Sequence, residues 1–147
     1  MKKLIYTCTA IIGLGFLLSS TSVDYPERGN SSFDVGEKLR YRVTYGFVDA
    51  GEAVMEVKST SKKGNGRSLY QAIGTGRTLA GFNAFFKVDD TYETYLDKQG
   101  IFPWYFKRRV DEGGYIINQD YTFKHHQYKV DNGEGKELKI PMGVQDM

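Results

Sequence analysis

The chain has 147 residues, of which 40% are apolar and 26% charged, a composition typical of a single globular domain and unlike that of disordered, collagenous or coiled-coil chains. Its 20 basic and 18 acidic residues leave a net charge of +2, which provides no cationic field for a phosphate backbone and predicts no nucleic-acid partner. One cysteine excludes an intramolecular disulfide and any metal site built from several cysteines, and no cofactor is predicted.

The first 22 residues have the pattern of a secretory signal peptide. Residues 1–3 form a short positive start, and residues 10–18 form an apolar stretch. Ser20 and Ser22 are small residues of the kind that signal peptidase requires, so we expect cleavage before Val23. The alternative is a retained membrane anchor, but a spanning helix needs roughly 20 apolar residues and this stretch is shorter. We therefore predict an exported chain with no spanning helix after cleavage.

A flexible leader is predicted for residues 23–32, because Pro26, Gly29 and several polar residues occur there without an apolar period. We expect a single β domain over residues 33–147. The sequence stops just after a predicted strand, so this domain is expected to be incomplete at its C-terminus.

The region after residue 33 is dominated by an alternation of apolar with polar or charged residues, which is typical of half-buried β-strands. Turns rich in Gly, Asn and Asp separate the strands and favour tight hairpins. The predicted strands cover residues 39–45, 52–58, 69–76, 88–96, 101–110, 115–123, 127–130 and 137–140. Roughly seven or eight strands in this arrangement predict a mainly β fold, an antiparallel meander that curls into a half-barrel or barrel.

One segment departs from the alternation and predicts a short helix near residues 78–86. Leu79, Phe82, Phe85 and Phe86 recur there at a spacing of three to four residues, which is the helical period. We expect this helix to plug the concave side of the sheet.

Several motifs together resemble a known family. They are residues 33–41 (FDVGEKLRY), residues 89–97 (DDTYETYLD), Phe102-Pro103 and residues 112–115 (EGGY). Over residues 33–147 the chain resembles the DUF3108 family of exported bacterial proteins, common in Bacteroidetes. The resemblance implies a curved antiparallel sheet, a location in the periplasm or at the outer membrane, and a chain that is the N-terminal fragment of a longer one. The family's function is unknown, so it implies no catalytic residues.

Large aromatic residues are the most informative feature for function, and they predict a concave apolar pocket for a lipid or acyl chain. Gly74 and Gly76 would leave room on the same face. The predicted ligand-binding residues are Phe82, Phe85, Phe86, Tyr92, Trp104 and Phe106. Two alternatives stay open: these rings form a packed core that needs no ligand, or the protein is a structural or assembly module that binds an envelope protein.

Charged residues and histidines suggest little chemistry. Glu93 and Asp97 share one face of a predicted strand, so a carbohydrate-active enzyme is a further alternative, but solvated charges opposite an apolar face explain them better. Arg108 is expected to pair with Glu93 across neighbouring strands. His125 and His126 are adjacent, so on a strand they would point to opposite faces. We predict that they lie at the surface and that no residue is catalytic or binds a metal.

Overall fold

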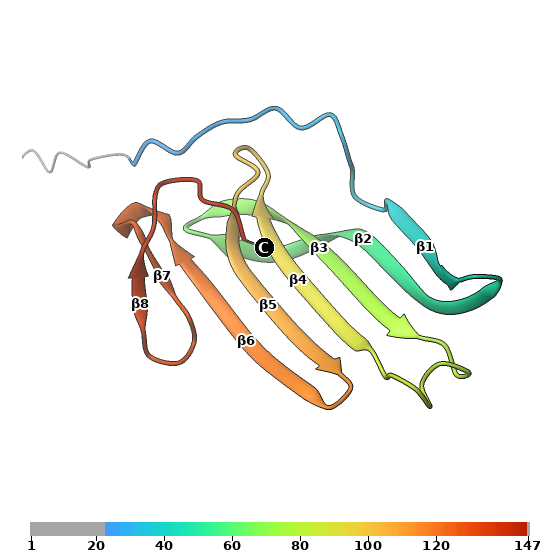
Figure 1. Cartoon of the computed structure of the whole chain (residues 1–147). Coiled ribbons are helices and arrows are strands. Elements are labelled where there is room, and N and C mark those ends of the chain that lie inside the picture. The colour runs from blue at the N-terminus through green and yellow to red at the C-terminus, as the bar shows by residue number, and fades with distance from the viewer. Residues whose placement is uncertain (1–22, 147) are drawn as a thin grey trace, which may run out of the picture.

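The computed structural model describes residues 23–146, which build one eight-stranded antiparallel sheet (Figure 1). The strands pair in chain order, so each strand neighbours the one before it and the one after it. Their bounds are β1 (Lys38–Tyr45), β2 (Val48–Gly64), β3 (Arg67–Thr78), β4 (Asp89–Asp97), β5 (Pro103–Glu112), β6 (Tyr115–Lys124), β7 (Lys129–Asp131) and β8 (Glu137–Lys139). This confirms the predicted mainly β meander. The predicted signal peptide lies outside the described residues.

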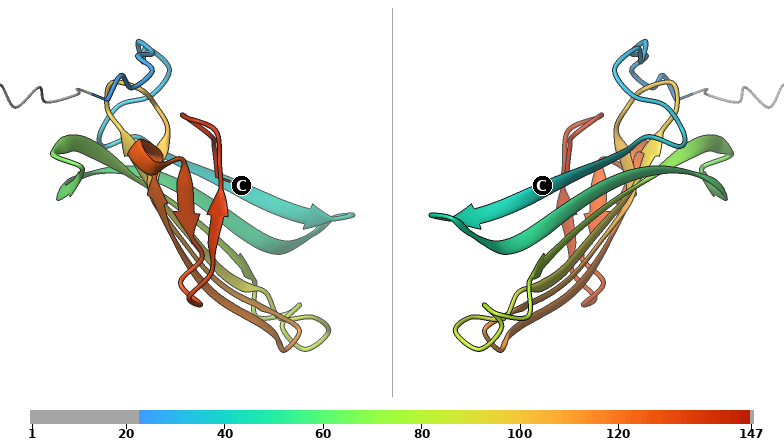
Figure 2. Two further views of the ribbon diagram at one scale, coloured as in Figure 1. Left: turned by 90° about the vertical axis from the view of Figure 1, so that its left-hand side faces the viewer. Right: turned by 90° about the vertical axis from the view of Figure 1, so that its right-hand side faces the viewer.

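The sheet is strongly curved and stays open, as a half-barrel (Figure 2). In the side views β1 and β2 extend forward at one edge, while β7, β8 and the C-terminal segment fold over the same side at the other edge. A register shift in β2 between Ser59 and Lys63 inserts extra residues into a long strand, and such irregularities increase bending and twist. The curvature therefore gives the sheet a concave and a convex face.

Strand register determines which residues lie on each face, because directly paired residues point to the same side. The concave face carries Leu39, Tyr41, Val43, Ala53, Met55, Val57, Ala72, Gly74, Gly76, Tyr92, Phe106, Arg108, Val110, Tyr121, Phe123 and Val130. The convex face is charged and includes the ion pairs of Glu52 with Arg40 and Arg77. The period of two in the sequence thus separates an apolar surface from a charged one.

Strand β1 differs from its prediction as a half-buried strand. Leu39, Tyr41 and Val43 point to the concave side but are 41%, 51% and 52% exposed, respectively. Within residues 23–146, no element covers this part of the concave face. The alternation is therefore correct, but the apolar half of β1 lies open.

The best-packed part of the protein is the end of the sheet where the β2–β3, β4–β5 and β6–β7 connections meet. We call it the packed end and define it by Leu69, Asp97, Phe102, Trp104 and His125, all of which are buried. The chain before β1 also contributes, because the Tyr25 ring stacks on Phe102 with centroids 5.9 Å apart.

The opposite end carries the β1–β2, β3–β4 and β5–β6 connections and is much less covered. We call it the open rim and define it by Phe47, Phe85, Phe86, Tyr115 and Ile116, which are all exposed. The connections contact one another, since the amide of Gly113 donates to the carbonyl of Lys87 at 2.7 Å.

The predicted helix at residues 78–86 is wrong, and residues 80–85 form consecutive turns instead. The segment has only isolated helical hydrogen bonds, such as Phe86 N to Phe82 O at 3.0 Å. Gly81 lowers the helical propensity of a segment that is too short to be a stable helix. Its ends are also held by the hairpin, where the amide of Thr78 donates to the carbonyl of Val88 at 3.0 Å. The segment therefore closes the β3–β4 connection at the open rim and does not plug the concave side.

Candidate functional site

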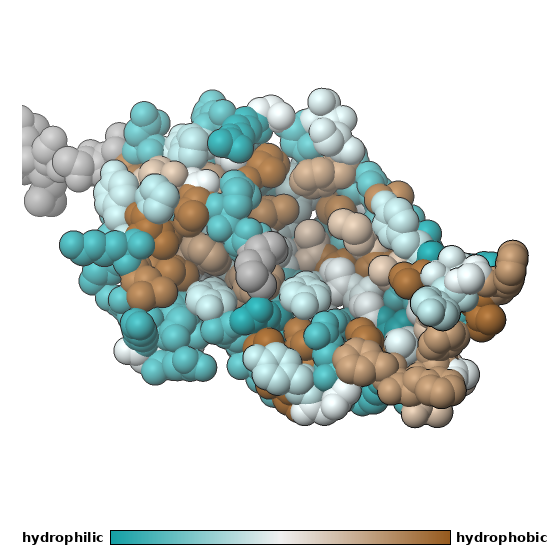
Figure 3. Space-filling model, in the orientation of Figure 1, coloured by the Kyte–Doolittle hydropathy of each residue, from teal (hydrophilic) through white to brown (hydrophobic). Residues whose placement is uncertain are grey.

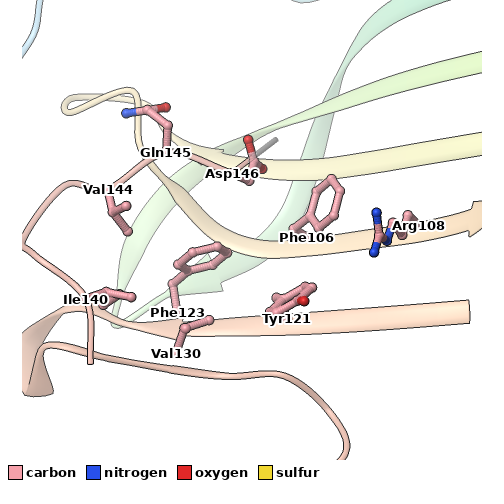
Figure 4. A pocket seen from close by; sticks show the side chains of 9 residues that line it. All are labelled: Phe106, Arg108, Tyr121, Phe123, Val130, Ile140, Val144, Gln145 and Asp146. Atoms are coloured by element: carbon pink, nitrogen blue, oxygen red, sulfur yellow. The ribbon is translucent and has the colours of Figure 1, made fainter. Parts of the chain in front are cut away.

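The concave face contains a hollow of about 280 Å³ between the sheet and the C-terminal segment (Figure 4). A pocket of this size is near the lower end of the range for small-molecule sites. We use "the hollow" for the space lined by Phe106, Arg108, Tyr121, Phe123, Val130, Ile140, Val144, Gln145 and Asp146. Viewed from the concave side, apolar residues gather over the sheet among hydrophilic ones, and apolar surface also reaches the edge of the molecule at the lower right (Figure 3).

The floor of the hollow is a row of aromatic rings that crosses neighbouring strands. Tyr92 of β4, Phe106 of β5 and Tyr121 of β6 follow one another, with ring centroids 6.5 Å and 6.1 Å apart. Phe123 continues the row along β6, 6.5 Å from Tyr121. The rings lie together because alternate residues of each strand point to the same face. The floor is thus a continuous apolar surface.

The wall of the hollow comes from the chain that follows β8. Ile140 and Val144 pack against the buried cluster of Phe106, Phe123 and Val130. The segment is held to the packed end, because the amide of Gly143 donates to Nδ1 of His125 over 3.4 Å. One side of the hollow is therefore attached to the most buried part of the protein.

Two charged side chains line the hollow. Arg108 donates from Nε to Oε1 of Gln119 on β6 at 2.9 Å. Burial raises the pKa of the Asp146 carboxyl, and its hydrogen bond with Thr94 offsets this only in part. Oδ2 of Asp146 has no hydrogen-bond partner among the described residues. The hollow is thus apolar with a cation and a poorly solvated carboxyl at its margin.

Next to the hollow, β3 contributes almost no side-chain bulk to the concave face. A Cβ atom added to Gly74 would meet nothing closer than Cβ of Tyr92 at 4.0 Å, and one added to Gly76 would meet only Cβ of Asp90 at 4.0 Å. Together with Ala72, these residues form a shallow strip, which we call the bare strip. The space expected at these glycines is present.

The structure distributes the predicted ligand-binding residues over three places. Phe106 lines the hollow and Tyr92 packs beside it. Trp104 belongs to the packed end, where its Nε1 donates to Oδ2 of Asp97 at 3.1 Å. Phe82 and Phe85 pack on each other in the β3–β4 connection, with centroids 6.4 Å apart. The third phenylalanine of this connection, Phe86, contacts the β5–β6 turn.

Sequence reasoning missed the residues on the far wall of the hollow. Ile140 and Val144 both follow β8, and only their apolar character could have indicated burial. Arg108 was expected to pair with Glu93, and this is wrong. Their side chains lie on opposite faces, since Glu93 is opposite Lys107 whereas Arg108 is opposite Tyr92.

The Asp97 carboxylate has a structural role, and the prediction that it is solvated is wrong. Arg67 binds it in a bidentate manner at 2.5 Å and 2.8 Å, and the amides of Gln99 and Gly100 donate to Oδ1 at 2.9 Å and 2.8 Å. Burial alone would raise the pKa of Asp97, but the hydrogen bonds from Arg67, Trp104 and the amides lower it overall. Glu93 accepts a hydrogen bond from Gln71 at 2.9 Å on the convex face. Asp97 therefore lacks the environment of a raised-pKa general acid.

His125 is also buried, which corrects its prediction as a surface residue. Its Nε2 lies 2.7 Å from the carbonyl of Pro103, and its ring stacks on Phe123 and edges onto Phe102. Residues 125–127 form a 3₁₀ turn, so the strand alternation assumed for the two histidines does not apply. His126 is exposed. Among residues 23–146, no three or more His, Cys, Asp or Glu side chains are grouped as metal ligands would be.

The fold and the hollow place this chain among proteins built on a single curved β-sheet. Its concave face is apolar and its convex face is charged. The chain belongs to the family described as "Protein of unknown function (DUF3108)", which matches residues 40–147. No curated protein and no solved structure matches the chain. Within the described residues, no helix is long and apolar enough to cross a membrane.

Proposed function

We propose that this protein is an exported cell-envelope protein, located in the periplasm or at the outer membrane, that binds a lipid or acyl chain on its concave face. The observation that carries the proposal is the uncovered apolar surface that continues from the hollow across the bare strip to β1. Met55 is 55% exposed and Tyr41 is 51% exposed on this surface. Exposed apolar surface of this extent is unusual on a soluble domain unless it binds something.

The shape of this surface favours a chain-like ligand. The aromatic floor supplies broad apolar contact, and the bare strip leaves a shallow path beside it. The signal-like sequence of residues 1–22 supports export, and an envelope protein has access to lipids.

The first test is native mass spectrometry with lipid extraction on residues 23–147, followed by titration with a fluorescent fatty acid. We expect a co-purifying lipid and saturable binding. Gly74→Phe should weaken binding roughly tenfold or more, because the ring would fill the shallow path beside the aromatic floor and block the acyl chain from lying there. Thr75→Phe is the matched control, since this neighbour lies on the convex face. A folded wild-type protein that holds no lipid and binds no probe would contradict the proposal.

A second candidate is an assembly module that binds an envelope protein through β1. All eight residues of β1 are exposed, and its outer edge pairs with no other described strand. Such an edge is able to accept an extended peptide as an additional strand. Photo-crosslinking from position 42 in intact cells should then recover one partner, and crosslinks that are absent or spread over unrelated proteins would speak against this candidate.

A further inference from the structure

Arg108 is unusual because it is a cation on an apolar face. On the concave face it lies near Phe106 and Tyr121 (Figure 4). Val110 follows on the same face of β5, and Tyr92 on β4 lies directly opposite Arg108. Along β4, β5 and β6 it is the only basic residue on this face. Moving a guanidinium into partly apolar surroundings is unfavourable unless an anion or several acceptors compensate it.

The other arginines of the strands have such a compensation. Each forms an ion pair with a carboxylate: Arg40, Arg42, Arg67, Arg77 and Arg109. Arg108 forms none within residues 23–146, and its side chain donates to the neutral Gln119.

Two acidic residues lie on the same face or line the same hollow, and neither forms an ion pair with Arg108. Asp90 directs Oδ1 to the amide of Asp111 at 3.1 Å. Asp146 lines the same hollow but forms no ion pair with Arg108, and burial raises the pKa of its carboxyl, which opposes ionisation. The charge of Arg108 is therefore available to a ligand in the hollow.

We propose that Arg108 binds the carboxylate of a long-chain acid whose acyl chain lies in the hollow. This inference rests on the proposed function and names the ligand class. The guanidinium is planar and presents parallel N–H donors that match a carboxylate. Nε is held by Gln119, which leaves the Nη groups for the headgroup. The single positive charge of Arg108 matches the single negative charge of a carboxylate, and the acyl chain would pack on the aromatic floor.

The test compares two probes of one chain, cis-parinaric acid and its methyl ester, at pH 7.5 and low salt. The wild-type protein should bind the acid more tightly than the ester. Arg108→Gln should weaken binding of the acid roughly 10- to 100-fold, the range expected for loss of a charge-assisted hydrogen bond. Its affinity for the ester should stay unchanged. Arg108→Lys keeps the positive charge but lacks the paired N–H donors of the guanidinium, so its affinity for the acid should lie between those of the wild-type protein and Arg108→Gln. Arg109→Gln is the matched control on the convex face.

The outcomes separate this inference from the proposed function. If neither probe binds the folded wild-type protein, both fail. If both probes bind equally well and Arg108→Gln changes neither, the Arg108 assignment is overturned while binding on the concave face stands. Dodecanoic acid should displace the probe better than dodecyl phosphate does, and the reverse order would overturn the choice of a carboxylate. Circular dichroism and thermal melting verify that each variant is folded.

Discussion

The packed end and the open rim are formed by the same strands, yet they differ in nearly every physical property. At the packed end, Leu69, Phe102 and His125 have no exposed surface, and a bidentate ion pair lies under the aromatic cluster. At the open rim, Phe85 is 86% exposed and Phe47 is fully exposed. Packing is therefore concentrated at one end of this sheet, and the other end and the concave face keep apolar side chains exposed.

The buried carboxylate of Asp97 should contribute most to the stability of the packed end. Asp97→Ala removes the partner of the Arg67 guanidinium and of the Trp104 indole, so it should lower the free energy of unfolding by about 3–5 kcal/mol. Asp120→Ala removes an exposed partner of Arg109 and should cost less than about 1 kcal/mol. Urea unfolding monitored by tryptophan fluorescence measures both, and similar losses would show that the packed end is not special.

Glycine-to-alanine substitutions should have opposite effects at the two ends. A Cβ atom on Gly64 would lie 2.1 Å from Cγ of the buried Trp104 ring, whereas one on Gly81 would meet nothing within 4 Å. Gly64→Ala should therefore lower the free energy of unfolding by about 1–3 kcal/mol, because the added methyl group overpacks this site. Gly81→Ala should be neutral or should stabilise the protein by up to about 1 kcal/mol, because alanine lowers the conformational entropy of the unfolded chain. Thermal melting of both variants is the measurement, and equal melting temperatures would refute the contrast.

The smallest effect is a pH dependence that comes from the packed end. Burial lowers the pKa of His125 from its ordinary value of 6.5, and the bond to Pro103 offsets this only in part. Below that value the unfolded chain takes up a proton that the folded protein resists, so stability falls as the pH falls.

Urea unfolding at pH 7.5 and pH 5.5 should therefore show a lower free energy of unfolding at the lower pH. His126→Gln, at the exposed neighbour, should retain this decrease, and His125→Phe should reduce it. An undiminished decrease in His125→Phe would assign the effect to other groups.

Much of the fold was predictable because it depends on local signals. The alternation of Leu39, Tyr41 and Val43 with Lys38 and Arg42 fixes the two faces of β1 without knowledge of any partner. Turns rich in Gly and Asn mark the hairpins, and strands joined by short turns pair with their neighbours. The meander and its apolar face follow from these signals alone.

The errors occur where distant contacts decide the structure. The partner of Asp97 is Arg67, which is 30 residues earlier, so the strand pattern gave no indication of the ion pair. The spacing of Leu79, Phe82 and Phe85 imitates a helix, but closure of the β3–β4 hairpin determines its conformation. In the candidate site, Phe106 was predictable from its strand, whereas Val144 reaches the hollow only through a tertiary fold of the C-terminal segment.

The pairing of strands in strict chain order also shapes how this sheet forms and comes apart. Each strand pairs only with the strands next to it in the chain, which keeps the contact order low for a β protein and favours rapid folding. A sheet of this kind is able to open from an edge without disturbing its centre. Amide hydrogen exchange should therefore begin in β1 and reach β4 and β5 last, so the surface proposed to bind lipid borders the part of the protein that opens most easily.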